Sequence, residues 1–214
     1  RNQLSNLDVT KNIELKNLDC SINQLTELDI TNNIVLDSLM CYSNQLTELD
    51  VTKNIKLKKL YCSKNELNNL DISNNIELIE LDCSDNQLNN LDVTKNIKLK
   101  GLVCSDNQLA SLDVRENTKL KKLYCFKNQL TELDVSKNKL LEVLSCFENK
   151  LTSLDISPIP YLKTLFCCDQ AEGFILYLTN KQKNMFYEEN YCDAILKEKD
   201  GSICEVEWLD IYPN

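Results

Sequence analysis

Cysteine recurs every 21 residues over most of this 214-residue chain. The column consists of Cys20, Cys41, Cys62, Cys83, Cys104, Cys125, Cys146 and Cys167. Aspartate keeps the same interval at Asp8, Asp29, Asp50, Asp71, Asp92, Asp113, Asp134 and Asp155. A unit this short cannot bury its own apolar residues, so successive units must stack on one another. The period therefore predicts an elongated solenoid, although the length alone would fit one or two ordinary globular domains.

A single repeat indicates how each coil is built. Residues 57–77 read L-x-x-L-x-C-x-x-N and then L-x-x-L-D-I-x-x-N. Apolar and polar residues alternate around Leu60 and Cys62, and again around Leu70 and Ile72, which is typical of extended segments with one buried face. Each coil is therefore predicted to hold two short extended segments, with its corners near the asparagines and little or no helix.

This motif resembles the leucine-rich repeat superfamily, and more narrowly the cysteine-bearing 21-residue repeats of Bacteroidetes surface and secreted proteins. The match covers residues 1 to about 167 in eight copies. The resemblance implies a solenoid of parallel strands stacked in register, secretion or surface display in a bacterium, and binding without catalysis. It implies no particular ligand. Pro158 and Pro160 interrupt the last full repeat, where we expect the regular winding to loosen.

Two regions are expected along the chain. Residues 1–167 form the solenoid, which begins in mid-repeat at Arg1, so we expect a truncated N-terminus. Residues 168–214 abandon the repeat and are expected to form a β-rich C-terminal cap that closes the open end. Within the cap, residues 174–178 are predicted to be a wholly buried strand, and Asp200-Gly201 to be the turn of a β-hairpin. Cys192 and Cys204 flank that turn and are candidates for a disulfide in an exported protein, which leaves Cys168 as an odd cysteine.

Composition narrows the function. The net charge of -9 comes from 24 basic and 33 acidic residues, which disfavours nucleic acid as a partner because phosphates attract clustered Lys and Arg. Histidine is absent, which excludes Ser-His-Asp and Cys-His catalysis as well as His-ligated zinc. No segment approaches the roughly 18 apolar residues of a membrane span. We therefore predict no enzyme activity, no cofactor and no membrane-spanning segment.

The repeated columns are interpreted as framework. In-register strands hold equivalent Cβ atoms about 4.8 Å apart, whereas a disulfide needs roughly 3.8 Å, so the cysteines are expected to be buried thiols without a metal. The asparagines are expected to bond main-chain groups at the corners. Each aspartate is expected to accept from the amide two residues on, helped by hydroxyls such as that of Thr52. A row of calcium sites is the alternative for the aspartates, and the glycine-poor corners disfavour it.

The outward positions of the first strand do not repeat, so any specific site is expected on this face. Four aromatic residues should gather near its C-terminal end: Tyr124, Phe126, Phe147 and Phe166. Contiguous exposed aromatic residues usually mark an interaction site, and the alternative is that the tail covers them as an extension of the core. A smaller candidate cluster lies nearer the N-terminus: Met40, Tyr42 and Tyr61.

The leading hypothesis is a non-enzymatic module that binds a protein partner through the exposed strand face. A glycan-binding surface protein is the first alternative, because aromatic rings stack on sugars. A structural spacer or adhesin stalk is the second. The resemblance places the protein outside a bacterial cell or on its surface, although reduced cysteines fit the cytoplasm equally well.

Overall fold

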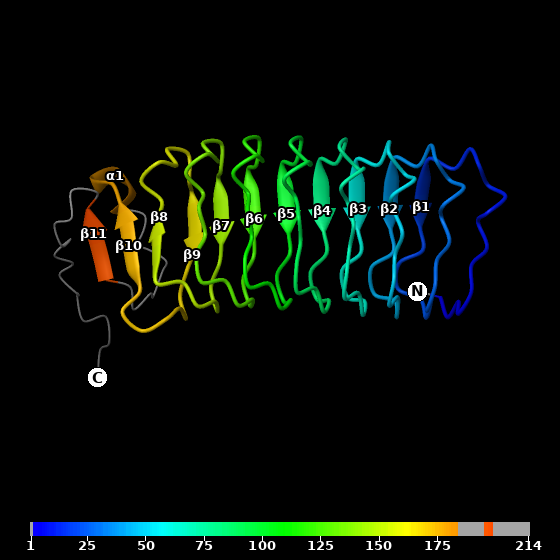
Figure 1. Cartoon of the computed structure of the whole chain (residues 1–214), viewed down its shortest axis with the longest axis horizontal. Coiled ribbons are helices and arrows are strands. Elements are labelled where there is room, and N and C mark those ends of the chain that lie inside the picture. The colour runs from blue at the N-terminus through cyan, green and yellow to red at the C-terminus, as the bar shows by residue number, and fades with distance from the viewer. Residues whose placement is uncertain (1, 184–194, 199–214) are drawn as a thin grey trace.

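The computed structural model describes residues 2–183 and 195–198, and it is a rod of stacked coils (Figure 1). Each coil contributes one three-residue strand to a sheet that runs along the rod, which confirms the leucine-rich repeat solenoid. The strands of this sheet are β1 (Asn17–Asp19), β2 (Ser38–Met40), β3 (Lys59–Tyr61), β4 (Glu80–Asp82), β5 (Gly101–Val103), β6 (Lys122–Tyr124), β7 (Val143–Ser145) and β9 (Thr164–Phe166). All neighbouring pairs are parallel, and each residue pairs with its equivalent 21 positions on.

The hydrophobic core fills the interior of the coils. The central leucine of each strand points inward, and Leu60, Leu102 and Leu123 are completely buried. The cysteine that follows each strand is buried beside it, as Cys62 and Cys104 show. Burial raises the pKa of the Cys62 and Cys104 thiols well above the ordinary value of 9.0, because a thiolate loses its hydration there. The prediction that the cysteine column is part of the core is confirmed.

The two asparagine columns close the corners, as predicted. Asn65 donates from Nδ2 to the carbonyl oxygens of Cys41 (3.1 Å) and Cys62 (3.0 Å), and its Oδ1 accepts from the amide of Leu46 at 3.0 Å. One side chain thereby satisfies main-chain groups in its own coil and in the preceding one. In the other column, Asn75 is fully buried and donates to Val51 O (2.9 Å) and Asn54 O (3.0 Å). Such bonds supply partners that strand pairing leaves unmet.

The aspartate column makes the expected local bonds. Asp50 Oδ1 accepts from the amide of Thr52 at 2.9 Å and from its hydroxyl at 2.6 Å. The bond from the amide two residues on recurs in every coil, including the last at Asp155 and Ser157. Among the described residues, the second segment of a coil is a strand only at β8 (Ser153–Asp155), which pairs with a strand of the C-terminal tail.

A left-handed residue follows the strand in every coil. Lys64 has a φ of 54° and Asp106 a φ of 51°, and the equivalent positions in the other coils are similar. Few residues other than glycine favour this region, which costs roughly 1–2 kcal/mol for an L-residue. The Asn65-type bonds next to this position therefore hold a backbone shape that the local sequence does not favour.

The C-terminal end changes its pairing. A second sheet has the order β11 (Ile195–Glu198), β10 (Ile175–Leu178) and β8, so the tail extends the face opposite the long sheet (Figure 1). The short helix α1 (Asn180–Lys183) follows β10. Strand β10 alternates half-buried and buried residues, so the predicted wholly buried strand is wrong. Strand β10 pairs with β8 on one side and with β11 on the other. Its buried residues, Leu176 and Leu178, form the face toward the core.

The prolines do not loosen the winding, contrary to the prediction. Strand β9 pairs with β7 in the same register as every earlier pair. The amide of Ile159 still bonds the carbonyl of Ile156 at 3.0 Å, as the asparagine amide does in earlier coils. Prolines at 158 and 160 fit because the bonded amide belongs to the residue between them. The proposed hairpin turn and the Cys192–Cys204 pair lie outside the described residues, and the division at residue 167 stays a prediction.

Candidate binding surface

Each strand of the long sheet has two outward residues, one on each side of the buried leucine, and all but Ser38 and Ser145 are exposed or half-buried. The first position carries Asn17, Ser38, Lys59, Glu80, Gly101, Lys122, Val143 and Thr164. The third position carries Asp19, Met40, Tyr61, Asp82, Val103, Tyr124, Ser145 and Phe166. Neither column repeats, whereas the buried positions between them are leucine throughout. The repeated core thus supports a sheet whose outward side chains differ from coil to coil.

A hollow of about 350 Å³ lies at the middle of this face. Gly101 forms its floor because the two neighbouring residues of its column, Glu80 and Lys122, carry long side chains and glycine carries none. A Cβ added at Gly101 would meet nothing within 4 Å, so the space above this residue is open. Tyr61 and Tyr124 line the hollow from β3 and β6, three strands apart, which is roughly 14 Å.

Opposite charges lie at the two ends of the hollow. Glu80 and Asp82 on β4 are both occupied: Glu80 accepts from the Tyr61 hydroxyl and pairs with Lys59 at 3.8 Å. Asp82 accepts from the Ser84 hydroxyl at 2.6 Å and from Ser63. At the other end, Lys100 and Lys122 line the hollow, and neither has an ion pair within the described residues. The available charge in the hollow is therefore positive.

Tyr61 is held in one place at the edge of the hollow. Its partial burial and its bond to Glu80 raise the pKa of the Tyr61 hydroxyl to about 12, because both disfavour the phenolate. At neutral pH the hydroxyl is protonated, and it already donates its hydrogen bond to Glu80. The ring of Tyr61 consequently serves as an apolar wall with its polar tip satisfied.

The predicted aromatic cluster is divided. Phe126 and Phe147 stack with their ring centroids 4.5 Å apart and an interplanar angle of 8°, and both are half-buried. Phe166 on β9 is 44% exposed. Tyr124 belongs to the hollow with Tyr61, which the sequence grouped with Met40 and Tyr42. Met40 and Tyr42 are half-buried near β2 and do not line the hollow.

Sequence reasoning missed the three residues that shape the hollow: Glu80, Gly101 and Lys122. A signal was present, because Gly101 is the only glycine within residues 1–167. A glycine in a strand often marks a place where another group approaches the backbone closely. The binding role of Met40, Tyr42, Tyr61, Tyr124, Phe126, Phe147 and Phe166 stays a prediction.

In the part of the chain that the structure describes, no group of three or more Cys, Asp or Glu side chains has the arrangement of a metal site. No helix among the same residues is long and apolar enough to cross a bilayer.

Known proteins support the fold. No protein-family model matches the sequence, and no curated protein matches it significantly. The functional domain of InlJ from Listeria monocytogenes, which includes a cysteine ladder, is 35% identical with a TM-score of 0.79, over 91% of this chain and 43% of that one. A leucine-rich repeat protein of Leptospira interrogans is 26% identical with a TM-score of 0.74, over 85% and 55%. The L. monocytogenes internalin InlF, 19% identical with a TM-score of 0.71 over 90% and 58%, shows the fold alone.

The chain thus spans about half the length of these proteins. It is similar to leucine-rich repeat proteins with a cysteine ladder, whereas the narrower resemblance to Bacteroidetes repeats stays a prediction.

Proposed function

We propose that this protein is a non-enzymatic binding module that takes a protein partner on the face of its long sheet, with the hollow over Gly101 as the anchor point. The observation that carries the proposal is the hollow itself. A side chain is missing at one position of an otherwise filled surface, and aromatic rings stand on both sides of the gap.

The chemistry of the hollow narrows the partner. Tyr61, Val103 and Tyr124 offer apolar walls, and Lys100 and Lys122 offer ammonium groups without an ion pair within the described residues. An extended segment of a protein partner could insert one apolar side chain between these walls. A carboxylate next to it would then pair with the lysines. Buried aromatic anchors surrounded by a polar rim carry most of the affinity in protein interfaces. The stacked Phe126–Phe147 pair and Phe166 extend the surface toward the C-terminal end.

The setting of the proposed function is the outside of a bacterial cell. Its support is the similarity to InlJ, a protein of the bacterium L. monocytogenes. Localisation of the tagged chain in its own host, with surface proteolysis of intact cells, tests this proposal separately from binding.

The test of binding uses Gly101→Phe and Gly101→Ala. The backbone at Gly101 is not left-handed, so either residue fits the strand, and only phenylalanine fills the hollow. The wild-type chain is screened by biolayer interferometry against a panel of purified proteins and a panel of polysaccharides, and each ligand found is titrated with both variants. We expect a protein ligand whose affinity falls about 10-fold or more with Gly101→Phe, and by less than about twofold with Gly101→Ala.

Two outcomes contradict the proposal. A protein ligand that binds Gly101→Phe as tightly as the wild type places the site elsewhere on the molecule. If ligands are found only in the polysaccharide panel, the partner is a glycan and not a protein. Because a bulky residue suits a strand better than glycine does, Gly101→Phe is not expected to lower the melting temperature. Thermal unfolding of each variant checks this.

A further inference from the structure

Five isoleucines form an exposed file along one edge of the rod. Ile13, Ile34, Ile55, Ile76 and Ile97 occupy equivalent positions in successive coils, and each is between 51% and 56% exposed. At a coil spacing of about 4.8 Å the file is roughly 19 Å long, so neighbouring side chains form one continuous stripe. Single exposed apolar residues are ordinary on a protein surface, but a contiguous stripe usually marks an interaction.

The backbone beneath the stripe is fixed. Each isoleucine lies in a turn. Ile34, Ile55, Ile76 and Ile97 directly follow a buried asparagine, whereas the asparagine before Ile13 is exposed. The amide of Asn54 bonds Val51 O at 3.0 Å, the amide of Leu57 bonds Asn54 O at 3.0 Å, and Asn54 Nδ2 bonds the preceding coil. Ile55 therefore stands on a turn whose position is already set, so little backbone order is lost when it binds.

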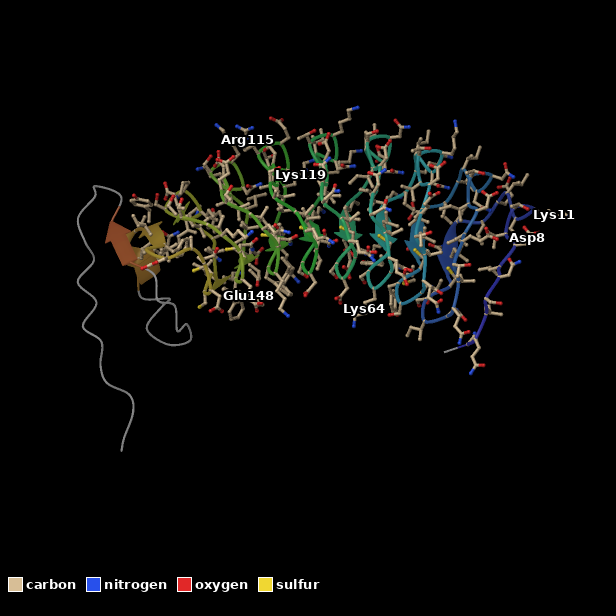
Figure 2. The ribbon with its side chains drawn as sticks, turned by 60° about the horizontal axis from the view of Figure 1, so that its bottom comes forward. Asp8, Lys11, Lys64, Arg115, Lys119 and Glu148 are labelled. Atoms are coloured by element: carbon tan, nitrogen blue, oxygen red, sulfur yellow. The ribbon has the colours of Figure 1, made fainter. Side chains whose placement is uncertain are left out.

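The edge that carries the stripe is basic. The equivalent seven-residue segments of the eight coils are residues 10–16, 31–37, 52–58, 73–79, 94–100, 115–121, 136–142 and 157–163, of which the first five carry the isoleucines. They hold 14 basic and five acidic residues, a net charge of +9 in a chain of net charge -9. Figure 2 shows Arg115 and Lys119 along this upper edge, with Lys64 and Glu148 along the opposite one.

Most of these basic residues form no ion pair within the described residues, although Lys53 also interacts electrostatically with Asp50, and Lys95 with Asp71 and Asp92. Ion pairs occupy Lys58, Lys98, Arg115, Lys121 and Lys163. Within the described residues the other nine have none: Lys11, Lys16, Lys53, Lys56, Lys95, Lys100, Lys119, Lys137 and Lys139. Three acidic residues of these segments already form ion pairs with their lysines: Asp37, Glu77 and Glu142. The edge thus combines an apolar stripe with ammonium groups, most of which form no ion pair within the described residues.

The aspartate column borders the edge, on the second face. There Asp29, Asp50 and Asp92 accept hydrogen bonds from the residue two further on, at the start of the turn. Along each coil the aspartate comes first, and lysines lie on both sides of the isoleucine. In one coil the order is Asp50, Lys53, Ile55 and Lys56. A surface that approaches from the edge meets the isoleucines and lysines first.

From these observations we infer that the isoleucine edge binds the surface of an anionic lipid bilayer. The stripe is a single file on turn tips, which would need a long matching groove on a protein partner. A bilayer interface accepts protruding apolar side chains, and its phosphate groups attract the lysines on either side. A rod that lies on its edge leaves the long sheet free, so this inference does not depend on the partner of that sheet.

The experiment is vesicle flotation with the purified chain. Vesicles of phosphatidylcholine containing about one third phosphatidylglycerol are compared with pure phosphatidylcholine, at low salt and at about 1 M NaCl. The first variant combines Ile55→Ser, Ile76→Ser and Ile97→Ser, with the three Ile→Leu changes as its conservative counterpart. The second combines Lys53→Gln, Lys95→Gln and Lys119→Gln. Its matched control, with the same net charge, combines Lys64→Gln, Lys127→Gln and Lys150→Gln on the opposite edge.

We expect binding to phosphatidylglycerol vesicles that weakens at high salt. The lysine variant should bind about 10-fold or more weakly, as should the serine variant, whereas the leucine variant and the matched control should bind like the wild type. Absence of flotation overturns the inference, as does equal binding by both lysine variants. Polyglutamate is the soluble acidic probe. If the chain binds it as tightly as vesicles and the serine changes have no effect, the edge takes an acidic soluble partner and the membrane inference is wrong. All variants are first matched for thermal unfolding.

Discussion

Gln182 in α1 donates from Nε2 to the carbonyl oxygen of Ile159 at 2.9 Å, and to that of Ile156 at 2.7 Å. Upstream, an asparagine of the following coil makes these two bonds: Asn138 Nδ2 donates to Val114 O at 2.9 Å and to Asn117 O at 3.0 Å. The helix thus ends this asparagine ladder by reproducing the side-chain bonds of one more coil. The buried Gln182 makes the hydrogen bonds that an asparagine of one further coil would make.

The Gln182 bonds predict a local loss of stability on truncation. Gln182→Ala leaves two buried carbonyl oxygens without this donor, and we expect it to lower the free energy of unfolding by about 1–3 kcal/mol. Lys181→Ala, in the same helix and exposed, should change it by less than about 0.5 kcal/mol. Urea unfolding followed by circular dichroism measures both. Equal effects of the two changes would show that Gln182 does not hold the end of the solenoid.

The buried asparagine ladder is expected to contribute more than its exposed neighbours. Asn75→Ala removes two bonds to main-chain oxygens in a fully buried corner, and should lower the free energy of unfolding by about 2–4 kcal/mol. The adjacent Asn74 is exposed and makes one bond, to Thr52 O at 3.2 Å, so Asn74→Ala should cost less than about 1 kcal/mol. Urea unfolding of the pair tests the difference, and similar midpoints would contradict it.

Acid should destabilise the protein through the aspartate column. Hydrogen bonds from the threonine two residues on lower the pKa of Asp50 and Asp92 below the ordinary value of 3.8, and the Arg115 guanidinium lowers the pKa of Asp113 to about 2. Groups whose pKa is lower in the folded state stabilise it at pH values above the unfolded pKa. That contribution is therefore present at neutral pH and lost as the pH falls from about 4 to about 2.

The measurement for this acid effect is the urea midpoint between pH 7 and pH 2. A variant with Thr31→Val, Thr52→Val and Thr94→Val removes three of the hydroxyl donors. Its stability should depend less steeply on pH below pH 4 than that of the wild type. A dependence as steep as that of the wild type would show that the hydroxyl bonds do not control these carboxylates.

The buried thiols should be unreactive in the folded protein. Burial raises the pKa of Cys41, Cys83 and Cys125 well above 9.0, and these thiols are also inaccessible. N-ethylmaleimide at pH 8 should label them only after denaturation, because the thiolate is the nucleophile. Mass spectrometry of the labelled peptides assigns each site. Labelling of Cys83 in the native protein at the rate of an unfolded peptide would contradict the buried ladder.

The repeating positions could be predicted because every coil poses the same physical problem. Leu60 and Cys62 recur in register in eight coils and Asn65 in seven, so one interpretation had to fit all of these coils at once. The Asx bond of Asp50 to Thr52 followed from the same constraint, because parallel carboxylates need partners. The outward positions of the strands differ from coil to coil, so no repeat constrained their interpretation. Tyr61 was grouped with Met40 and Tyr42 because they are near in the sequence, whereas in the structure it lines the hollow with Tyr124.

The sequence by itself determined the solenoid, its inward columns and its corners, because a 21-residue period leaves stacking as the way to bury leucine and cysteine. Only the tertiary structure decided what lies across several coils on the surface. It placed Tyr61 opposite Tyr124 over Gly101, and it left the isoleucine column from Ile13 to Ile97 exposed at one edge. It also placed Gln182 in the position of a ladder asparagine. The physical reason is that burial depends on a pattern within one coil, whereas a surface depends on which side chains the stacking brings side by side.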